Sequence, residues 1–116
     1  MKVVLIDDSR LARLELSNQL RQCAGIDIVG EAADVPQARK LIAATLPDLL
    51  LLDIDMPGGD GFSLLEQLDS QARLPHVIFV TAYDQYALKS FAYHAKDYLL
   101  KPVTLPRLQA ALAKVP

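Results

Sequence analysis

The sequence predicts a single α/β domain in which five strand–helix units, (βα)5, form a doubly wound parallel sheet. Short apolar runs of strand length alternate five times with longer segments of helical periodicity. The first run, VVLID (3–7), is apolar at consecutive positions, as is typical of a parallel strand buried on both faces. Such alternation implies right-handed crossovers and helices on both faces of the sheet.

Three strands and two helices are predicted in the first half of the chain. Ser9 is placed to cap a helix that runs through about Cys23. Asp34 is placed to cap a second helix, which has Pro36 in its first turn and is stopped by Pro47. The predicted strands are VVLID (3–7), IDIVGEA (26–32) and DLLLLD (48–53).

The second half continues the same alternation. Thr104 is placed to cap a last helix through about Lys114. The segment 84–94 is predicted to be helical, with one apolar side made of Ala87, Leu88, Phe91 and Ala95. The other predicted elements are a helix FSLLEQL (62–68) and the strands HVIFVT (76–81) and DYLL (97–100).

The composition fits one soluble globular domain of 116 residues, with 52% hydrophobic and 22% charged residues. The net charge of −2 argues against direct nucleic-acid or anionic-membrane binding by this segment. The single cysteine, Cys23, excludes an internal disulfide and fits a reducing, cytoplasmic setting. The longest aliphatic run, 49–52, is far shorter than the roughly 20 residues of a membrane helix.

Polar and charged residues stand at the ends of four predicted strands. They are Asp7, Asp8, Asp53, Thr81 and Lys101. In such sheets, ligands bind at the carboxyl ends of the strands, so all five residues are expected at one edge. Any one of them alone would be read as a helix cap or a solvated loop residue. The set of five is hard to assign to capping.

This set suggests phosphoryl chemistry. Three carboxylates repel one another and favour a cation, and oxygen ligands without His or Cys suit a hard ion such as Mg²⁺. A carboxylate beside such an ion can attack a phosphoryl group and form an aspartyl phosphate. Lys101 would then supply positive charge to the phosphoryl oxygens, and Thr81 would supply a hydroxyl donor.

Four motifs carry a family resemblance: LIDDSRLAR, LLLLDIDMPGGDG, IFVTAYD and DYLLKP. Together they resemble the receiver domain of two-component response regulators, over nearly all 116 residues. The stretch TAYDQYALKSFAYHAKDYLLKP is similar to the LytR/AlgR-like subgroup, whose members carry a DNA-binding LytTR domain after the receiver. The resemblance implies a flavodoxin-like sheet of strand order 2-1-3-4-5. It also implies that residues 1–116 are the receiver and that a C-terminal DNA-binding output domain lies outside this segment.

The resemblance assigns roles to the acidic residues. Asp53 would be the phosphoacceptor. Asp8 and Asp53 would bind Mg²⁺ directly, with Mn²⁺ as an alternative ion, and Asp7 would act largely through water. The backbone carbonyl of Asp55 would be a further ligand, and the Asp55 side chain could influence how long the phosphate lasts.

Four further residues receive roles in the same way. Thr81 and Lys101 would bind the phosphoryl oxygens, and the Lys101–Pro102 bond would be cis. Tyr98, three residues before Lys101, occupies the position of the aromatic switch residue, which turns inward as Thr81 moves toward the phosphoryl group.

The partner implied by the resemblance is a sensor histidine kinase, which would dock on the first helix and the loop after the last strand. A homodimer could form through the helix 84–94, the strand 97–100 and the last helix. The chain would act in phosphorelay signalling and transcription regulation. It would not be an enzyme, since it would catalyse only its own aspartyl phosphorylation and dephosphorylation.

Two other functions compete with this one. A haloacid-dehalogenase-like phosphatase also uses an aspartyl phosphate, and Asp53-Ile54-Asp55 superficially fits its acid pair. The order of the motifs opposes it, because there the nucleophile comes first, whereas here the acid pair precedes Asp53. A receiver-like interaction module that is never phosphorylated is opposed by the complete residue set. Arg10 and Arg13, next to the acidic ends, could help to meet a partner, but a solvated helix face is expected.

Overall fold

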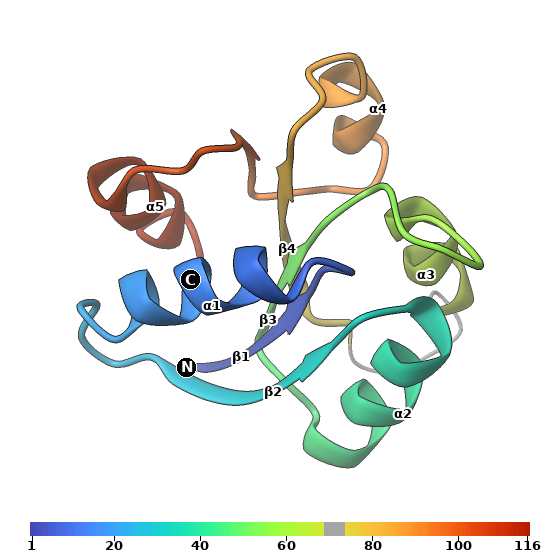
Figure 1. The fold of residues 1–116 in the computed structure, drawn as a ribbon, viewed down its shortest axis with the longest axis horizontal. Helices are drawn as coiled ribbons and strands as arrows, with labels where there is room; N and C mark the ends of the chain where they lie inside the picture. The colour runs from blue at the N-terminus through green and yellow to red at the C-terminus, as the bar shows by residue number, and fades with distance from the viewer. Residues whose placement is uncertain (69–73) are drawn as a thin grey trace.

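The computed structural model describes residues 1–68 and 74–116, which build one parallel sheet with helices on both faces (Figure 1). The strands are β1 (Lys2–Ile6), β2 (Asp27–Ala32), β3 (Leu49–Leu52), β4 (His76–Thr81) and β5 (Asp97–Leu100). Their order in the sheet is β2-β1-β3-β4-β5, and every neighbouring pair is parallel. The predicted fold and strand order are confirmed.

The described residues contain five helices, four between strands and one after β5, and three of them start at the predicted caps. The five helices are α1 (Arg10–Leu20), α2 (Val35–Thr45), α3 (Gly61–Leu68), α4 (Ala87–Phe91) and α5 (Leu105–Leu112). The side chains of Ser9, Asp34 and Thr104 each accept a hydrogen bond from the backbone N–H three residues later, as N-cap residues do. None of the helices in the described residues is long and apolar enough to cross a membrane.

The core forms one layer on each face of the sheet. Figure 1 shows α1 and α5 on one side, and α2 and α3 on the other. Alternate residues of the central strands serve the two layers, because successive strand side chains point to opposite faces. Val4 and Leu50 pack with α2 and α3, whereas Val3 and Leu51 pack with α1 and α5. The three central strands are therefore buried on both faces, as their apolar runs predict.

The segment 84–94 differs from its prediction. Only Ala87–Phe91 is helical, and His94 after it has a positive φ of 57°. The predicted apolar side is wrong in part, because 83% of Leu88 and 71% of Phe91 is exposed. Tyr86 and Tyr93, on either side of α4, provide the packing instead, with ring centroids 6.1 and 4.9 Å from that of Phe62. Aromatic contact, not the apolar periodicity, decides which side of α4 faces the protein.

Two other helices are shorter than expected at their C-terminal ends. The first helix ends at Leu20 and not at Cys23, and the last ends at Leu112 and not at Lys114. Both differences lie in the last turn, where helices commonly fray.

Candidate functional site

The parallel register brings the predicted residues to one edge of the sheet. Ile6 is paired with Leu52, so the residues that follow them, Asp7 and Asp53, leave neighbouring strands side by side. The Asp53 N–H donates to the carbonyl of Ile6 at 2.9 Å, which extends the β1–β3 ladder to the site itself. Asp53 is therefore placed by the strand and not by a free loop.

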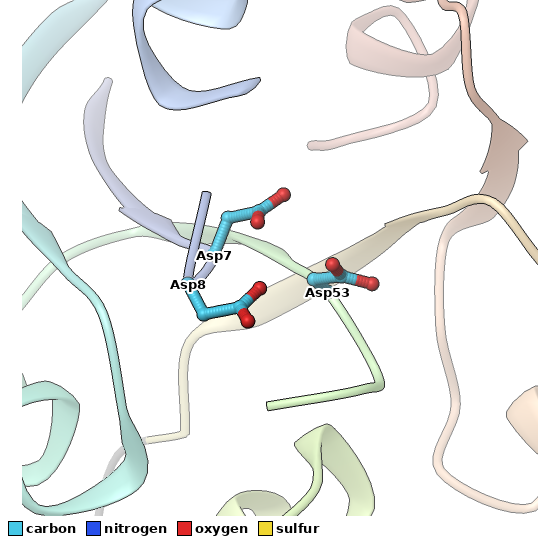
Figure 2. Close-up of side chains that lie close together, drawn as sticks. All are labelled: Asp7, Asp8 and Asp53. Carbon is cyan, nitrogen blue, oxygen red and sulfur yellow. The ribbon is translucent and has the colours of Figure 1, made fainter. Parts of the chain in front are cut away.

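Three carboxylates meet at this edge (Figure 2). Asp7, Asp8 and Asp53 each offer a carboxylate oxygen, and these oxygens all lie within 4.8 Å of one another. Asp7 and Asp53 are only 2% and 7% exposed, whereas Asp8 is exposed. Figure 2 shows Asp7 and Asp8 on consecutive positions, with Asp53 beside them. A set of oxygen donors with one open side fits a hard divalent cation that keeps some of its waters.

Lys101 balances part of this negative charge. Its ammonium lies 2.6 Å from Asp7 Oδ2 and 3.1 Å from Asp53 Oδ2. Burial alone would lower the pKa of Lys101, but the hydrogen bond to Asp7 and the charge of Asp53 outweigh it and raise the pKa. Lys101 is therefore firmly protonated, and its bond to Pro102 is cis, as predicted.

Asp53 is harder to ionise than an ordinary aspartate. Burial raises the pKa of Asp53, the charge of Asp7 raises it further, and Lys101 opposes both. Asp53 Oδ1 also accepts a hydrogen bond from the Ile54 N–H at 2.7 Å. A bound cation would relieve the repulsion that Asp53 meets from Asp7.

After Asp53 the chain turns away from the sheet and returns at Gly61, which lies against the backbone of Asp53. The Gly61 N–H donates to the carbonyl of Ile54 at 2.8 Å. A Cβ at position 61 would lie 2.5 Å from the backbone oxygen of Asp53, closer than such atoms approach in real structures. Gly61 thus lets the start of α3 pack directly under the phosphoacceptor candidate. Asp55, in the intervening turn, is exposed.

Thr81 and Tyr98 are linked by two hydrogen bonds to the backbone of Tyr83. Thr81, at the end of β4, is fully buried, and its hydroxyl oxygen accepts a hydrogen bond from the Tyr83 N–H at 3.3 Å. The Tyr98 hydroxyl donates to the carbonyl of the same Tyr83. Burial is the main reason that the pKa of Tyr98 is raised, so its hydroxyl stays protonated and able to donate.

Sequence reasoning missed one residue of this site. Arg13 was expected on a solvated helix face, but only 16% of its side chain is exposed. Its Nη1 donates to the backbone carbonyl of Asp7 at 2.6 Å, and its Nε donates to Glu31 at 2.9 Å. The position of Arg13, one turn into the helix that follows the acid pair, was the available signal.

Comparison with known proteins agrees with this geometry. A family model described as response regulator receiver domain matches residues 3–113. The chain is 44% identical over 115 residues to an uncharacterized response regulatory protein of Vibrio cholerae, covering 99% of this chain and 48% of the relative. It is 41% identical over 115 residues to the transcriptional regulatory protein BtsR of Escherichia coli, with the same coverage. The chain thus spans about half the length of these relatives.

Solved structures of the same kind share the fold. The response regulatory domain of protein mrkE from Klebsiella pneumoniae has a TM-score of 0.90 at 33% identity, covering 99% of this chain and 94% of that one. The REC domain of AraT, a response regulator from Geobacillus stearothermophilus, has a TM-score of 0.88 at 32% identity, covering 98% and 91%. The family match over most of the chain supports a receiver and not a phosphatase. The chain belongs to the response regulator receiver domains, the phosphorelay signalling modules of two-component systems.

Proposed function

We propose that Asp53 accepts a phosphoryl group from a sensor histidine kinase and that this transfer depends on Mg²⁺. The observation that carries the proposal is the position of the Lys101 ammonium, 2.6 Å from Asp7 and 3.1 Å from Asp53. A cation within a cluster of three carboxylates, at the carboxyl edge of a parallel sheet, is what a phosphoryl-transfer site requires.

The transfer is a displacement at phosphorus. A carboxylate oxygen of Asp53 attacks the phosphoryl group on the kinase histidine, and the new P–O bond forms as the P–N bond breaks. The imidazole leaves with the bonding electron pair and recovers a proton from solvent, while Asp53 becomes an acyl phosphate. Lys101 and the Thr81 hydroxyl interact with the phosphoryl oxygens as charge spreads over them.

Asp7, Asp8 and Asp53 would hold the Mg²⁺ ion, together with the backbone carbonyl of Asp55. The oxygen donors fit Mg²⁺, and Mn²⁺ would suit the same set. When bound, the ion supplies positive charge to the transferring phosphoryl group. The exposed Asp8 and Asp55 leave the open side of the site toward solvent, where a small phosphodonor or a kinase could approach.

We propose that Tyr98 reports the phosphorylation of Asp53. Thr81, Tyr83 and Tyr98 form a short chain of hydrogen bonds that runs from the end of β4 to β5. A Thr81 hydroxyl that turns toward a phosphoryl oxygen changes its bond to the Tyr83 N–H. The Tyr83 carbonyl, and with it the Tyr98 ring, then follows.

The surface beside this switch would be the output face. Leu88 and Phe91 of α4 are 83% and 71% exposed, and Leu100 of β5 is 48% exposed. Apolar side chains so far exposed are suited to an interface, so a homodimer through α4, β5 and α5 is proposed. Phosphorylation would act on this dimer through Tyr98, which lies on the same strand as Leu100.

The kinase would dock on α1 and on the loop after β5. Leu11 and Leu14 of α1 are 64% and 52% exposed, and a cleft of about 150 Å³ separates α1 from the turn of Lys101 to Val103. Alanine substitutions between Leu11 and Gln19, apart from Arg13, should therefore slow phosphotransfer from the kinase and leave acetyl phosphate labelling intact. Unchanged transfer from the kinase would contradict this docking surface.

The proposed output is transcription regulation through a second domain of a longer protein. Relatives of about twice this length include the transcriptional regulatory protein BtsR. A DNA-binding LytTR domain, as in the LytR/AlgR-like subgroup, is the proposed output domain. The receiver itself, with a net charge of −2, would not bind DNA directly.

Beryllofluoride tests the proposed function. It mimics an aspartyl phosphoryl group, so fluorine NMR with Mg²⁺ should show a bound resonance for the wild type and none for Asp53→Asn. A wild type without a bound resonance would instead support a receiver-like module that is never phosphorylated, and an equal bound resonance in Asp53→Asn would contradict Asp53 as the phosphoacceptor.

A further inference from the structure

We infer that Arg13 is a positioning residue for the cation site, because its guanidinium fixes the peptide between Asp7 and Asp8. This inference rests on the proposed Mg²⁺ site and adds a residue to it. Arg13 would touch neither the ion nor the phosphoryl group. It would act by setting where the Asp8 carboxylate lies before the ion arrives.

The guanidinium joins the ends of two strands. Nη1 of Arg13 donates to the backbone carbonyl of Asp7 at 2.6 Å, just beyond the end of β1. Nε donates to a carboxylate oxygen of Glu31 at 2.9 Å, near the end of β2. The planar guanidinium is held by both bonds at once, and only 16% of the side chain is exposed. Arg13 is therefore an ordered part of the sheet edge.

The Asp7–Asp8 peptide lies at the point where the backbone hydrogen bonds between β1 and β2 end. The Asp7 N–H donates to the Ala32 carbonyl at 3.0 Å, next to the last β1–β2 pair. The Asp7 side chain accepts from the Ser9 N–H at 2.9 Å and from Lys101. The Asp8 side chain makes no hydrogen bond or ion pair within residues 1–68 and 74–116. Its place in the acidic cluster thus depends on the backbone, whose Asp7 carbonyl is held by Arg13.

An effect of the Arg13 charge and a positioning effect of its side chain predict opposite changes in Mg²⁺ affinity when Arg13 is replaced. A guanidinium bonded to the backbone carbonyl of Asp7, beside the acidic cluster, competes electrostatically with a bound cation, so the loss of its charge alone would tighten Mg²⁺ binding. Loss of a group that orients the ligands should weaken Mg²⁺ binding, as is typical for outer-shell partners of metal ligands. The direction of the change in affinity therefore separates the two roles.

The test is a Mg²⁺ titration of Arg13→Met against Arg10→Met. Arg10 is an exposed residue of the same helix, without a side-chain hydrogen bond or ion pair in the described part of the chain. Arg13→Met should weaken Mg²⁺ binding by about 10-fold or more. Arg10→Met should leave it unchanged or slightly tighter. Affinity of Arg13→Met equal to or tighter than wild type would overturn the inference.

Amide hydrogen exchange without metal gives an independent reading. The Ser9 N–H, which donates to Asp7, should exchange faster in Arg13→Met than in the wild type or in Arg10→Met. Unchanged exchange would contradict the positioning role. Should Arg13→Met fail to fold by circular dichroism, Arg13→Gln serves both measurements, since it is also neutral and too short to reach both acceptors. A wild type that does not bind Mg²⁺ would refute the proposed function instead.

Discussion

The Tyr98 hydroxyl donates a hydrogen bond to the backbone carbonyl of Tyr83, two residues beyond the end of β4. The N–H of Tyr83 donates to the Thr81 hydroxyl. A side chain of β5 is thereby linked to the residue proposed to contact the phosphoryl group. We propose this link as the route by which phosphorylation of Asp53 affects the surface that carries Leu100.

Tyr98→Phe should uncouple phosphorylation from the output face. The variant loses one hydrogen bond and about 1 kcal/mol of unfolding free energy, and acetyl phosphate should still label it. Beryllofluoride should shift the dimer equilibrium of the wild type, measured by analytical ultracentrifugation, but not that of Tyr98→Phe. Tyr93→Phe is the matched control, because its hydroxyl bonds Glu66 at 2.6 Å, away from Thr81. A normal response of Tyr98→Phe would contradict the link.

Lys101→Met should separate cation binding from phosphoryl transfer. Removal of the ammonium from Asp7 and Asp53 leaves the acidic cluster unbalanced, so Mg²⁺ should bind several-fold more tightly, up to about 10-fold. Labelling by acetyl phosphate should nevertheless slow by about 100-fold or more, because a donor to the phosphoryl oxygens is lost. Lys96→Met, before the opposite end of β5, should change neither quantity. Weaker Mg²⁺ binding by Lys101→Met would contradict the charge balance described.

Asp53→Asn should stabilise the cation-free protein at neutral pH. The raised pKa of Asp53 means that its ionised form is disfavoured in the folded state relative to the unfolded state. This penalty is absent below the ordinary pKa of 3.8 and complete above the folded pKa. Urea unfolding at pH 7 should therefore show a gain of about 0.5–2 kcal/mol that fades toward pH 3 and shrinks with saturating Mg²⁺. A loss of stability at pH 7 would contradict the assignment.

Asp97 should have the opposite pH dependence. Arg107 donates to its carboxylate at 2.7 and 2.8 Å, and Lys114 donates at 2.9 Å, so the pKa of Asp97 is lowered. The resulting stability is present above the ordinary pKa of 3.8 and is lost as pH falls toward the lower folded pKa. Asp97→Asn should cost about 1–2 kcal/mol at pH 7 and less at acid pH.

The control for Asp97→Asn is Asp27→Asn. Asp27 is exposed at the start of β2, and its side chain makes no hydrogen bond in the described ranges. Its replacement should change the unfolding free energy by less than about 0.5 kcal/mol at either pH. An Asp97→Asn effect that is the same at pH 7 and pH 3 would rule out the ion pairs as its source.

Much of the site follows from the sequence because a parallel sheet collects its strand ends at one edge. Once 3–7 and 48–53 are strands in neighbouring positions, Asp7 and Asp53 must lie side by side, and the structure places them so. Lys101 follows β5, which the apolar pattern predicted, and its cis bond to Pro102 was predicted by the motif resemblance alone.

The features that the sequence did not reveal depend on contacts between distant elements. The bond of Arg13 to Glu31 requires β2 to lie beside β1 with a register shift between Val3 and Val4. The exposure of Phe91 depends on the contacts of Tyr86 and Tyr93 with Phe62, which apolar periodicity within 84–94 could not show. Periodicity identifies an apolar side of a helix, but it does not identify what covers that side.

The most direct measurement of the central claim is the intact mass of the protein after incubation with acetyl phosphate and Mg²⁺. The wild type should gain one phosphoryl group, which peptide mapping after borohydride reduction should locate at Asp53. Asp53→Asn, and the wild type with excess EDTA, should gain none. A wild type that stays unmodified, or an Asp53→Asn variant modified equally, would contradict the assignment of Asp53 as the phosphoacceptor.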